Sequence, residues 1–152
     1  MSVLDRVREL GARESGLAVA ITTRADGGPR ASVVNAGVLD HPVTGQPIVG
    51  FVARGRARKL DDLRERPQVT VVFRSGWEWL AVEGHAQLAG PLDPLEGLAM
   101  DGVPNLLRTV YAAAVGGSAD DWIGLADSIA TEGHTAVLVR AARIYPTGAS
   151  TS

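Results

Sequence analysis

The amino-acid sequence has no cysteine among its 152 residues, which excludes disulfide bonds, a thiol nucleophile and every metal site with cysteine ligands. Aromatic residues make up only 5% of the chain, too few to interleave with basic residues in a surface on which nucleic-acid bases stack. The formal net charge of −2 also lacks the basic field that nucleic-acid binders usually carry. We therefore predict that the protein does not bind nucleic acid.

Long apolar runs are missing as well. No run approaches the roughly 20 residues of a membrane-spanning helix, and the first ten residues contain four charged side chains where a signal peptide would be apolar. We expect a soluble, cytoplasmic protein with no membrane partner. The length fits one domain with a single core, which we assign to residues 1–147, with a small polar tail over 148–152 that we expect to be disordered.

The motifs of several enzyme classes are also absent. His41, His85 and His134 stand apart from one another without the spacing of a metal site, so we predict no metal. There is no G-x-S-x-G motif for a nucleophilic serine, and the glycines form neither a P-loop nor G-x-G-x-x-G. Hydrolase chemistry, ATP hydrolysis and a Rossmann nicotinamide site therefore have no support in the sequence.

The pattern of apolar residues predicts a protein that is mainly β. Six apolar, β-branched runs separated by turn residues predict strands: 17–23, 31–39, 48–52, 69–73, 77–88 and 135–145. Helical spacing predicts short helices over Val3–Arg13 and Ala57–Arg66, and weaker helices within 98–115 and 119–130. Because strands and helices do not alternate, we expect a closed or partly open antiparallel barrel with appended helices.

Positive charge is concentrated in the first half of the chain. Residues 1–66 carry eleven basic and eight acidic side chains, whereas residues 67–152 carry four and nine. Fourteen of the fifteen basic residues are arginines, and Lys59 is the only lysine. Four cations, Arg54, Arg56, Arg58 and Lys59, fall within six positions with no acid among them.

This cationic segment joins a predicted strand to a predicted helix. Arg58 and Lys59 would lie in the first turn of that helix, where the helix dipole disfavours each cation by about 0.3–1 kcal/mol. A bound phosphate would compensate, because helix N–H groups and flanking cations together form an anion site. Two alternatives stay open: a solvated surface in which Asp61 and Asp62 pair with some of the cations, or a patch that binds an acidic protein partner.

The order of motifs resembles the split-barrel superfamily of pyridoxamine 5'-phosphate oxidase. The resemblance covers about residues 14–90 and is carried by Ala57-Arg58-Lys59 at a helix start, by Arg66-Pro67 before a strand, and by the strand Trp79–Gly84. It implies a six-stranded antiparallel split β-barrel that forms a homodimer. It also implies flavin mononucleotide (FMN) or the deazaflavin coenzyme F420 in a cleft between subunits, with the cofactor phosphate on Arg58 and Lys59.

Within that superfamily the chain looks like the deazaflavin-dependent branch. Ala57 replaces the serine of the family's Ser-Arg-Lys element, and Val52-Ala53 replaces a Tyr-Thr pair. Trp79 stands where the oxidases have a glutamine that contacts flavin, which favours F420 over FMN. The chain also lacks the oxidases' C-terminal ending with Trp and Arg, so pyridoxamine phosphate oxidation is not expected.

The remaining site residues follow from the resemblance and from the charge pattern. Residues 31–35 would run beside the cofactor ring and offer backbone amides, with Asn35 either contacting the ring or satisfying a neighbouring backbone group. Trp77 and Trp79 would share one strand face, lining the cleft or covering a barrel end or dimer contact, and Arg54 and Arg56 would reach the coenzyme's oligoglutamate tail. The candidate cofactor-binding residues are Ser32, Val33, Val34, Asn35, Val52, Ala53, Arg54, Arg56, Arg58, Lys59, Trp77 and Trp79.

These observations predict an oxidoreductase that transfers a hydride from reduced F420 to an electron-poor small molecule. The segment 105–129, with Tyr111 and Trp122, is the predicted wall of the substrate site, and no catalytic side chain is assigned. The alternatives are an FMN-dependent oxidoreductase of the same fold and a carrier that holds the cofactor without turnover.

Overall fold

The computed structural model describes residues 2–116 and 133–146. The elements are, in chain order, α1 (Val3–Arg13), β1 (Leu17–Thr23), β2 (Pro29–Asp40), β3 (Pro47–Ala53), α2 (Arg58–Glu65), β4 (Gln68–Ser75), β5 (Glu78–Ala89), the 3₁₀ turn η1 (Met100–Gly102), α3 (Val103–Val115) and β6 (Thr135–Tyr145). The helix predicted over 119–130, Trp122 and the tail 148–152 lie outside the described residues. No helix in the two described ranges is long and apolar enough to cross a membrane.

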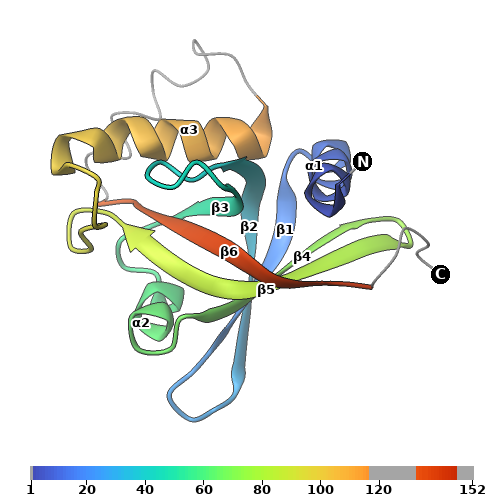
Figure 1. Cartoon of the computed structure of the whole chain (residues 1–152). Helices are drawn as coiled ribbons and strands as arrows, with labels where there is room; N and C mark the ends of the chain where they lie inside the picture. The colour runs from blue at the N-terminus through green and yellow to red at the C-terminus, as the bar shows by residue number, and fades with distance from the viewer. Residues whose placement is uncertain (1, 117–132, 147–152) are drawn as a thin grey trace.

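The six strands close into one antiparallel barrel in the order β1-β2-β3-β6-β5-β4 (Figure 1). The predicted mainly β fold is confirmed, and the first three strands form a meander. β2 is long: its residues Pro29–Asn35 pair with β1, whereas its ladder with β3 begins only at Ala36. One edge of β2 over residues 29–35 therefore has no strand partner among the described residues.

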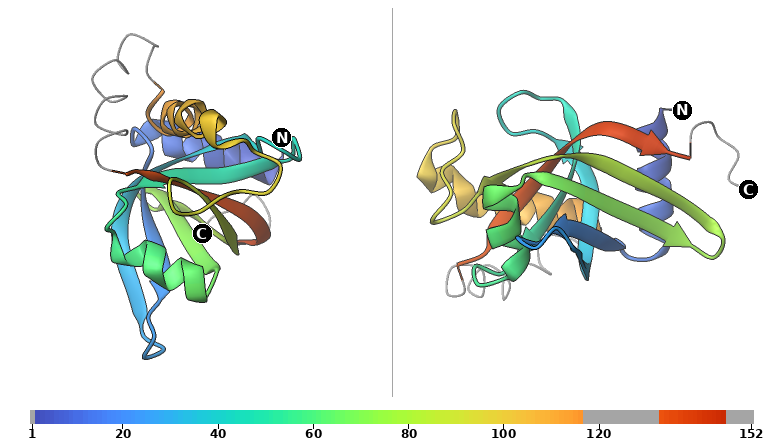
Figure 2. Two further views of the ribbon diagram at one scale, coloured as in Figure 1. Left: turned by 90° about the vertical axis from the view of Figure 1, so that its left-hand side faces the viewer. Right: turned by 90° about the horizontal axis from the view of Figure 1, so that it is seen from below.

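The barrel core follows from strand alternation. In β1, Ala18, Ala20 and Thr22 are buried while Leu17 and Val19 are exposed, the period of two expected of a strand with one face in a core. Helices close the two ends (Figure 2). α1 inserts Val7 and Leu10, and α2 inserts Leu60 and Leu63, each contributing about 1.5–3 kcal/mol by burial. α2 is thus part of the core and not a loosely attached helix.

α3 covers the outer surface of β2, β3 and β6 (Figure 1). Leu106, Leu107 and Val110 pack there into a second apolar cluster. Gly37 of β2 permits this approach, because a Cβ at that position would collide with the backbone of Ala113. The helix predicted within 98–115 is confirmed over α3, and its first part is the 3₁₀ turn.

The start of β5 differs from the prediction. Ser75 pairs with Glu78, so Gly76 and Trp77 form a two-residue turn, and Gly76 has the positive φ of 61° that such turns require. Trp77 is therefore outside the strand, with 96% of its surface exposed. The prediction that Trp77 and Trp79 share one strand face is wrong.

Candidate anion and cofactor site

The four cations Arg54, Arg56, Arg58 and Lys59, here called the cationic turn, connect β3 to α2. β3 ends at Ala53, and the next residues form a turn in which the Ala57 N–H donates to the Arg54 carbonyl at 2.9 Å. α2 then begins at Arg58. The predicted position of Arg58 and Lys59 in the first turn of a helix is confirmed.

The start of α2 has no side-chain cap. Ala57 at the N-cap position has no side chain that accepts a hydrogen bond, so the first N–H groups of the helix lack the usual cap. Arg56 and Arg58 are exposed and Lys59 is half-buried. Within residues 2–116 and 133–146, no carboxylate pairs with any of these three cations. Burial alone lowers the pKa of Lys59, because its charge is partly removed from water without a compensating partner.

The aspartates that were expected to pair with the cationic turn pair elsewhere. Asp61 binds Arg64 at 3.1 Å, and Asp62 accepts a hydrogen bond from Arg30 at 2.7 Å and lies 3.8 Å from Arg66. The alternative in which Asp61 and Asp62 neutralise the turn is therefore not found for Arg56, Arg58 or Lys59.

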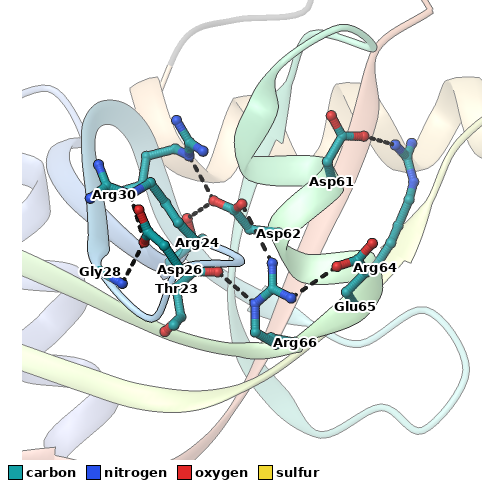
Figure 3. Close-up of polar contacts among 11 residues, drawn as sticks. Thr23, Arg24, Asp26, Gly28, Arg30, Asp61, Asp62, Arg64, Glu65 and Arg66 are labelled. Atoms are coloured by element: carbon teal, nitrogen blue, oxygen red, sulfur yellow. Dashed lines mark hydrogen bonds and ion pairs between the residues drawn. The ribbon is translucent and has the colours of Figure 1, made fainter.

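Asp62 instead fixes α2 to the β1–β2 hairpin (Figure 3). Its side chain is only 4% exposed and accepts hydrogen bonds from the Thr22 hydroxyl and the Arg30 guanidinium, both at 2.7 Å. Burial would raise the pKa of Asp62, but these hydrogen bonds and the charges of Arg30 and Arg66 hold it below the ordinary value. Asp62 thereby positions the helix that carries Arg58 and Lys59.

Two further arginines complete this attachment. Arg64 binds Asp93, in the turn after β5, through two contacts of 2.9 and 2.7 Å, and Arg66 donates to the Thr23 carbonyl at 2.9 Å. Sequence reasoning assigned no role to Arg30, Arg64 or Asp93. The contacts Arg30–Asp62 and Arg64–Asp93 join residues 32 and 29 positions apart in the chain, so no local signal could have identified them.

The β2 segment of the predicted site, residues 31–35, pairs with β1 and precedes the ladder with β3, which begins at Ala36. Val33 points outward and is 69% exposed, whereas Val34 is buried in the barrel core. Ser32 is half-buried. The Asn35 amide donates to the Ser15 carbonyl at 3.0 Å, so its side chain does satisfy a neighbouring backbone group. What the segment offers a ligand is the backbone edge of residues 29–35, which has no strand partner among the described residues.

Val52 and Ala53 can contribute only backbone groups. Ala53 is buried in the barrel core and Val52 packs against the cluster beneath α3. Both apolar side chains are thus explained by packing.

Trp79 lies away from the cationic turn within one chain. It pairs with Arg74 at the end of β4 remote from α2, and its ring meets Tyr145 edge-on at a centroid distance of 6.1 Å. Arg143 lies 5.3 Å from the Tyr145 ring centre. Burial and a hydrogen bond to Glu83 raise the pKa of Tyr145.

Trp79 belongs to an apolar outer surface of the barrel. Cross-strand partners Val33, Val19 and Val72 form a row over β2, β1 and β4, and Leu17 and Trp79 extend it. Leu17 is 50%, Val19 36% and Trp79 37% exposed. We call these five residues the apolar face. It shares Val33 and Trp79 with the predicted cofactor-binding residues.

Neither a metal nor a complete substrate wall is evident in the described part of the chain. No group of three histidine, aspartate or glutamate side chains within it is placed to hold a metal ion. Of the segment 105–129, the structure describes residues up to 116. Most of these belong to α3, and their apolar side chains pack against the strands beneath that helix.

Comparisons with known proteins identify the fold. No model of a known protein family matches the chain, and no curated protein matches it. Among solved structures, a conserved hypothetical protein of Mycobacterium tuberculosis superposes with a TM-score of 0.65 at 19% identity, over 100% of this chain and 95% of that one. A pyridoxamine 5'-phosphate oxidase-related, FMN-binding protein of Nostoc punctiforme gives 0.59 at 11%, over 95% and 84%.

A protein described as an F420 reductase is also similar, with a TM-score of 0.54 at 13% identity over 86% of this chain and 90% of that one. At these identities the likeness establishes the shared fold. One flavin-binding and one deazaflavin-using protein are therefore built on the same barrel as this chain.

Proposed function

Because the chain has the split-barrel fold of the pyridoxamine 5'-phosphate oxidase-like proteins, we propose that it is an oxidoreductase that binds coenzyme F420 and reduces an electron-poor small molecule. The observation that carries this proposal is the uncapped start of α2, where Lys59 is half-buried and has no carboxylate partner among the described residues. A phosphate monoanion or dianion would supply the missing negative charge.

The residues present fit a phosphate. The start of α2 without a side-chain cap, the exposed guanidinium of Arg58 and the ammonium of Lys59 lie on one short segment. Arg54 and Arg56 precede it and would extend the anion site toward the carboxylates of the oligoglutamate tail. The attachment of α2 through Asp62 and Arg64 keeps this segment in place before any ligand arrives.

When bound, reduced F420 supplies a hydride that, with a proton from water, reduces the acceptor and leaves the cofactor oxidised. The protein's part is to bind the phosphate, to orient the ring along the open edge of β2 near residues 31–35, and to exclude water. Backbone N–H groups of that edge would stabilise negative charge on the ring. No acid–base side chain is required of the chain by this chemistry.

A homodimer would complete the site. The apolar face is exposed in one chain, and a second copy would bury it. Because Val33 of that face lies in the β2 segment beside the proposed ring site, the cofactor would sit where the two copies meet. This arrangement would also explain how Trp79, remote from the cationic turn in its own chain, could contact a cofactor.

The phosphate assignment is tested by binding. Purified protein titrated with oxidised F420, and separately with FMN, should show saturable fluorescence quenching with F420 at micromolar concentration. Arg58→Ala with Lys59→Ala should weaken F420 binding at least about tenfold, because each charge-assisted contact contributes about 1.5–3 kcal/mol. Arg8→Ala, which removes an exposed arginine of α1, is the matched control and should bind normally. Unchanged affinity in the double variant would refute the assignment.

The same purified protein distinguishes F420 from FMN as the cofactor, and an enzyme from a carrier. Tighter binding of FMN than of F420 would replace the proposed cofactor with FMN. Saturable F420 binding without oxidation of reduced F420 by any of a panel of quinones and enones would make the protein a carrier. Oxidation of reduced F420 that depends on an added substrate would establish an oxidoreductase, provided that the double variant Arg58→Ala with Lys59→Ala abolishes it.

Oligomeric state is measured independently by sedimentation. We expect a dimer for the wild type, and Val33→Asp should shift it to monomer because a charge would be buried at the apolar face. Val43→Asp, at a comparably exposed valine outside the face, should remain dimeric. A wild-type monomer at micromolar concentration would refute the dimer.

A further inference from the structure

A small pocket on the outer surface of β5 and β6 is lined by hydrogen-bond donors. Its volume is about 250 Å³, and His85, Gln87 and Arg140 form much of its wall beside the β2–β3 connection. It shares no residue with the cationic turn. None of its seven lining residues is acidic, so the pocket provides positive charge with no internal counter-ion.

His41, at the base of this pocket, sets the orientation of Gln87. The backbone N–H groups of Val43 and Thr44 donate to His41 Nδ1 at 3.1 and 3.2 Å, so this nitrogen carries no proton and the ring is the neutral Nε2–H tautomer. Nε2 then donates to Gln87 Oε1 at 2.7 Å. Since the amide oxygen of Gln87 is used in this way, its NH₂ group is left to donate into the pocket.

A β-bulge places the two basic side chains next to each other. The register of β5 against β6 shifts between Glu83 and Gly84, and after it His85 is the direct cross-strand partner of Arg140. Gly84 is needed for this, because a Cβ there would collide with the Arg140 carbonyl oxygen. Bulges often re-aim side chains beside binding sites. Arg140 has no ion pair within the described residues.

We propose that this pocket binds a small oxyanion, the carboxylate or phosphate group of a metabolite, through Arg140, His85 and the Gln87 amide. A guanidinium matches two oxygens of such a group in its plane, and the Gln87 amide, held by His41, adds a donor of fixed direction. The volume accommodates a group of several heavy atoms and excludes a whole nucleotide.

The test uses the intact protein and two probes, inorganic phosphate and succinate, with sodium chloride at matched ionic strength as the reference. Histidine ring signals are followed by NMR, and His85→Gln identifies the signal of His85. We expect a saturable shift of that signal with at least one probe. Stronger binding of phosphate indicates a phosphorylated ligand, and stronger binding of succinate indicates a carboxylate.

Variants assign the contacts. Arg140→Gln should weaken binding of the preferred probe about tenfold or more, and Gln87→Leu should weaken it several-fold while the fold, followed by circular dichroism, stays intact. Arg143→Gln, on the same strand but outside the pocket, should bind as the wild type does. The proposal is overturned by shifts that do not saturate, by equal shifts with chloride, or by equal losses in Arg140→Gln and Arg143→Gln. None of these results bears on the cofactor proposal, because the two sites share no residue.

Discussion

The charged side chains at the two ends of α2 differ in whether they have partners. Toward the C-terminal end, Asp62 and Arg66 have partners on β1 and β2 (Figure 3), and Arg64 binds Asp93 in the turn after β5. At the N-terminal end, Arg58 and Lys59 have no carboxylate partner within residues 2–116 and 133–146, and the helix has no cap. The same eight-residue helix thus has one end held by partners on other elements and one end at which we propose that an external anion binds.

The largest stability effect should come from the paired end. Asp62→Asn removes the buried charge that Arg30 and Arg66 share, and we expect it to lower the free energy of unfolding by about 3 kcal/mol. Asp61→Asn, one position away and largely exposed, should change it by less than about 0.5 kcal/mol. Urea denaturation measures both, and similar losses in the two variants would contradict the assigned difference.

Acid should remove the stabilisation that the Asp62 carboxylate provides. Because the folded-state pKa of Asp62 lies below its unfolded value, its stabilisation is complete above that unfolded value, near pH 4, and is lost as the pH falls through the folded pKa. The stability gap between wild type and Asp62→Asn should therefore narrow below about pH 4. A gap that stays constant between pH 6 and pH 3 would argue against this role.

A smaller loss of stability is expected when the contact between Arg64 and Asp93 is removed. Arg64→Gln breaks the two contacts with Asp93, which are partly exposed, so about 1 kcal/mol should be lost. Arg58→Gln removes the same charge from the same helix and should cost no stability, because no partner is lost. Thermal unfolding of the pair measures the contrast, and equal destabilisation would remove the distinction between the two ends.

The smallest effect should have the opposite sign. Lys59→Met removes a half-buried, uncompensated cation from a helix start, so the free protein should gain about 0.5 kcal/mol while F420 binding weakens. Lys59→Arg keeps the charge and should retain most of the binding without that gain. A loss of stability in Lys59→Met would show that another group of the free protein already compensates the positive charge of Lys59.

Sequence patterns predicted the elements because their causes are local. The alternation in Leu17–Thr23 and the spacing of Leu60 and Leu63 are visible without the fold, and the helix predicted over Ala57–Arg66 is observed over Arg58–Glu65. The error at Trp77 is also local. The strands predicted over 69–73 and 77–88 leave a turn between them, but a tight hairpin between Ser75 and Glu78 has Gly76 and Trp77 as its two turn residues, so Trp77 lies outside the strand.

The site was predictable only where its signal is a run of charges. The cationic turn stands out in the sequence, but which aspartates neutralise which arginines depends on barrel closure. Asp62 meets Arg30 across 32 positions, and His41 meets Gln87 across 46. The sequence allows Asn35 to contact either a ligand or the backbone, and its hydrogen bond to the Ser15 carbonyl follows only from the fold.

The central claim is that a cofactor phosphate compensates Lys59, and the chain makes this directly measurable because Lys59 is its only lysine. Protein labelled with ¹³C at the lysine ε-carbon gives one side-chain signal, whose pH titration reports the pKa of Lys59 without and with F420. The account predicts a pKa below the ordinary lysine value in the free protein and a rise to or above that value once F420 is bound. A titration that is the same with and without bound F420 would contradict it.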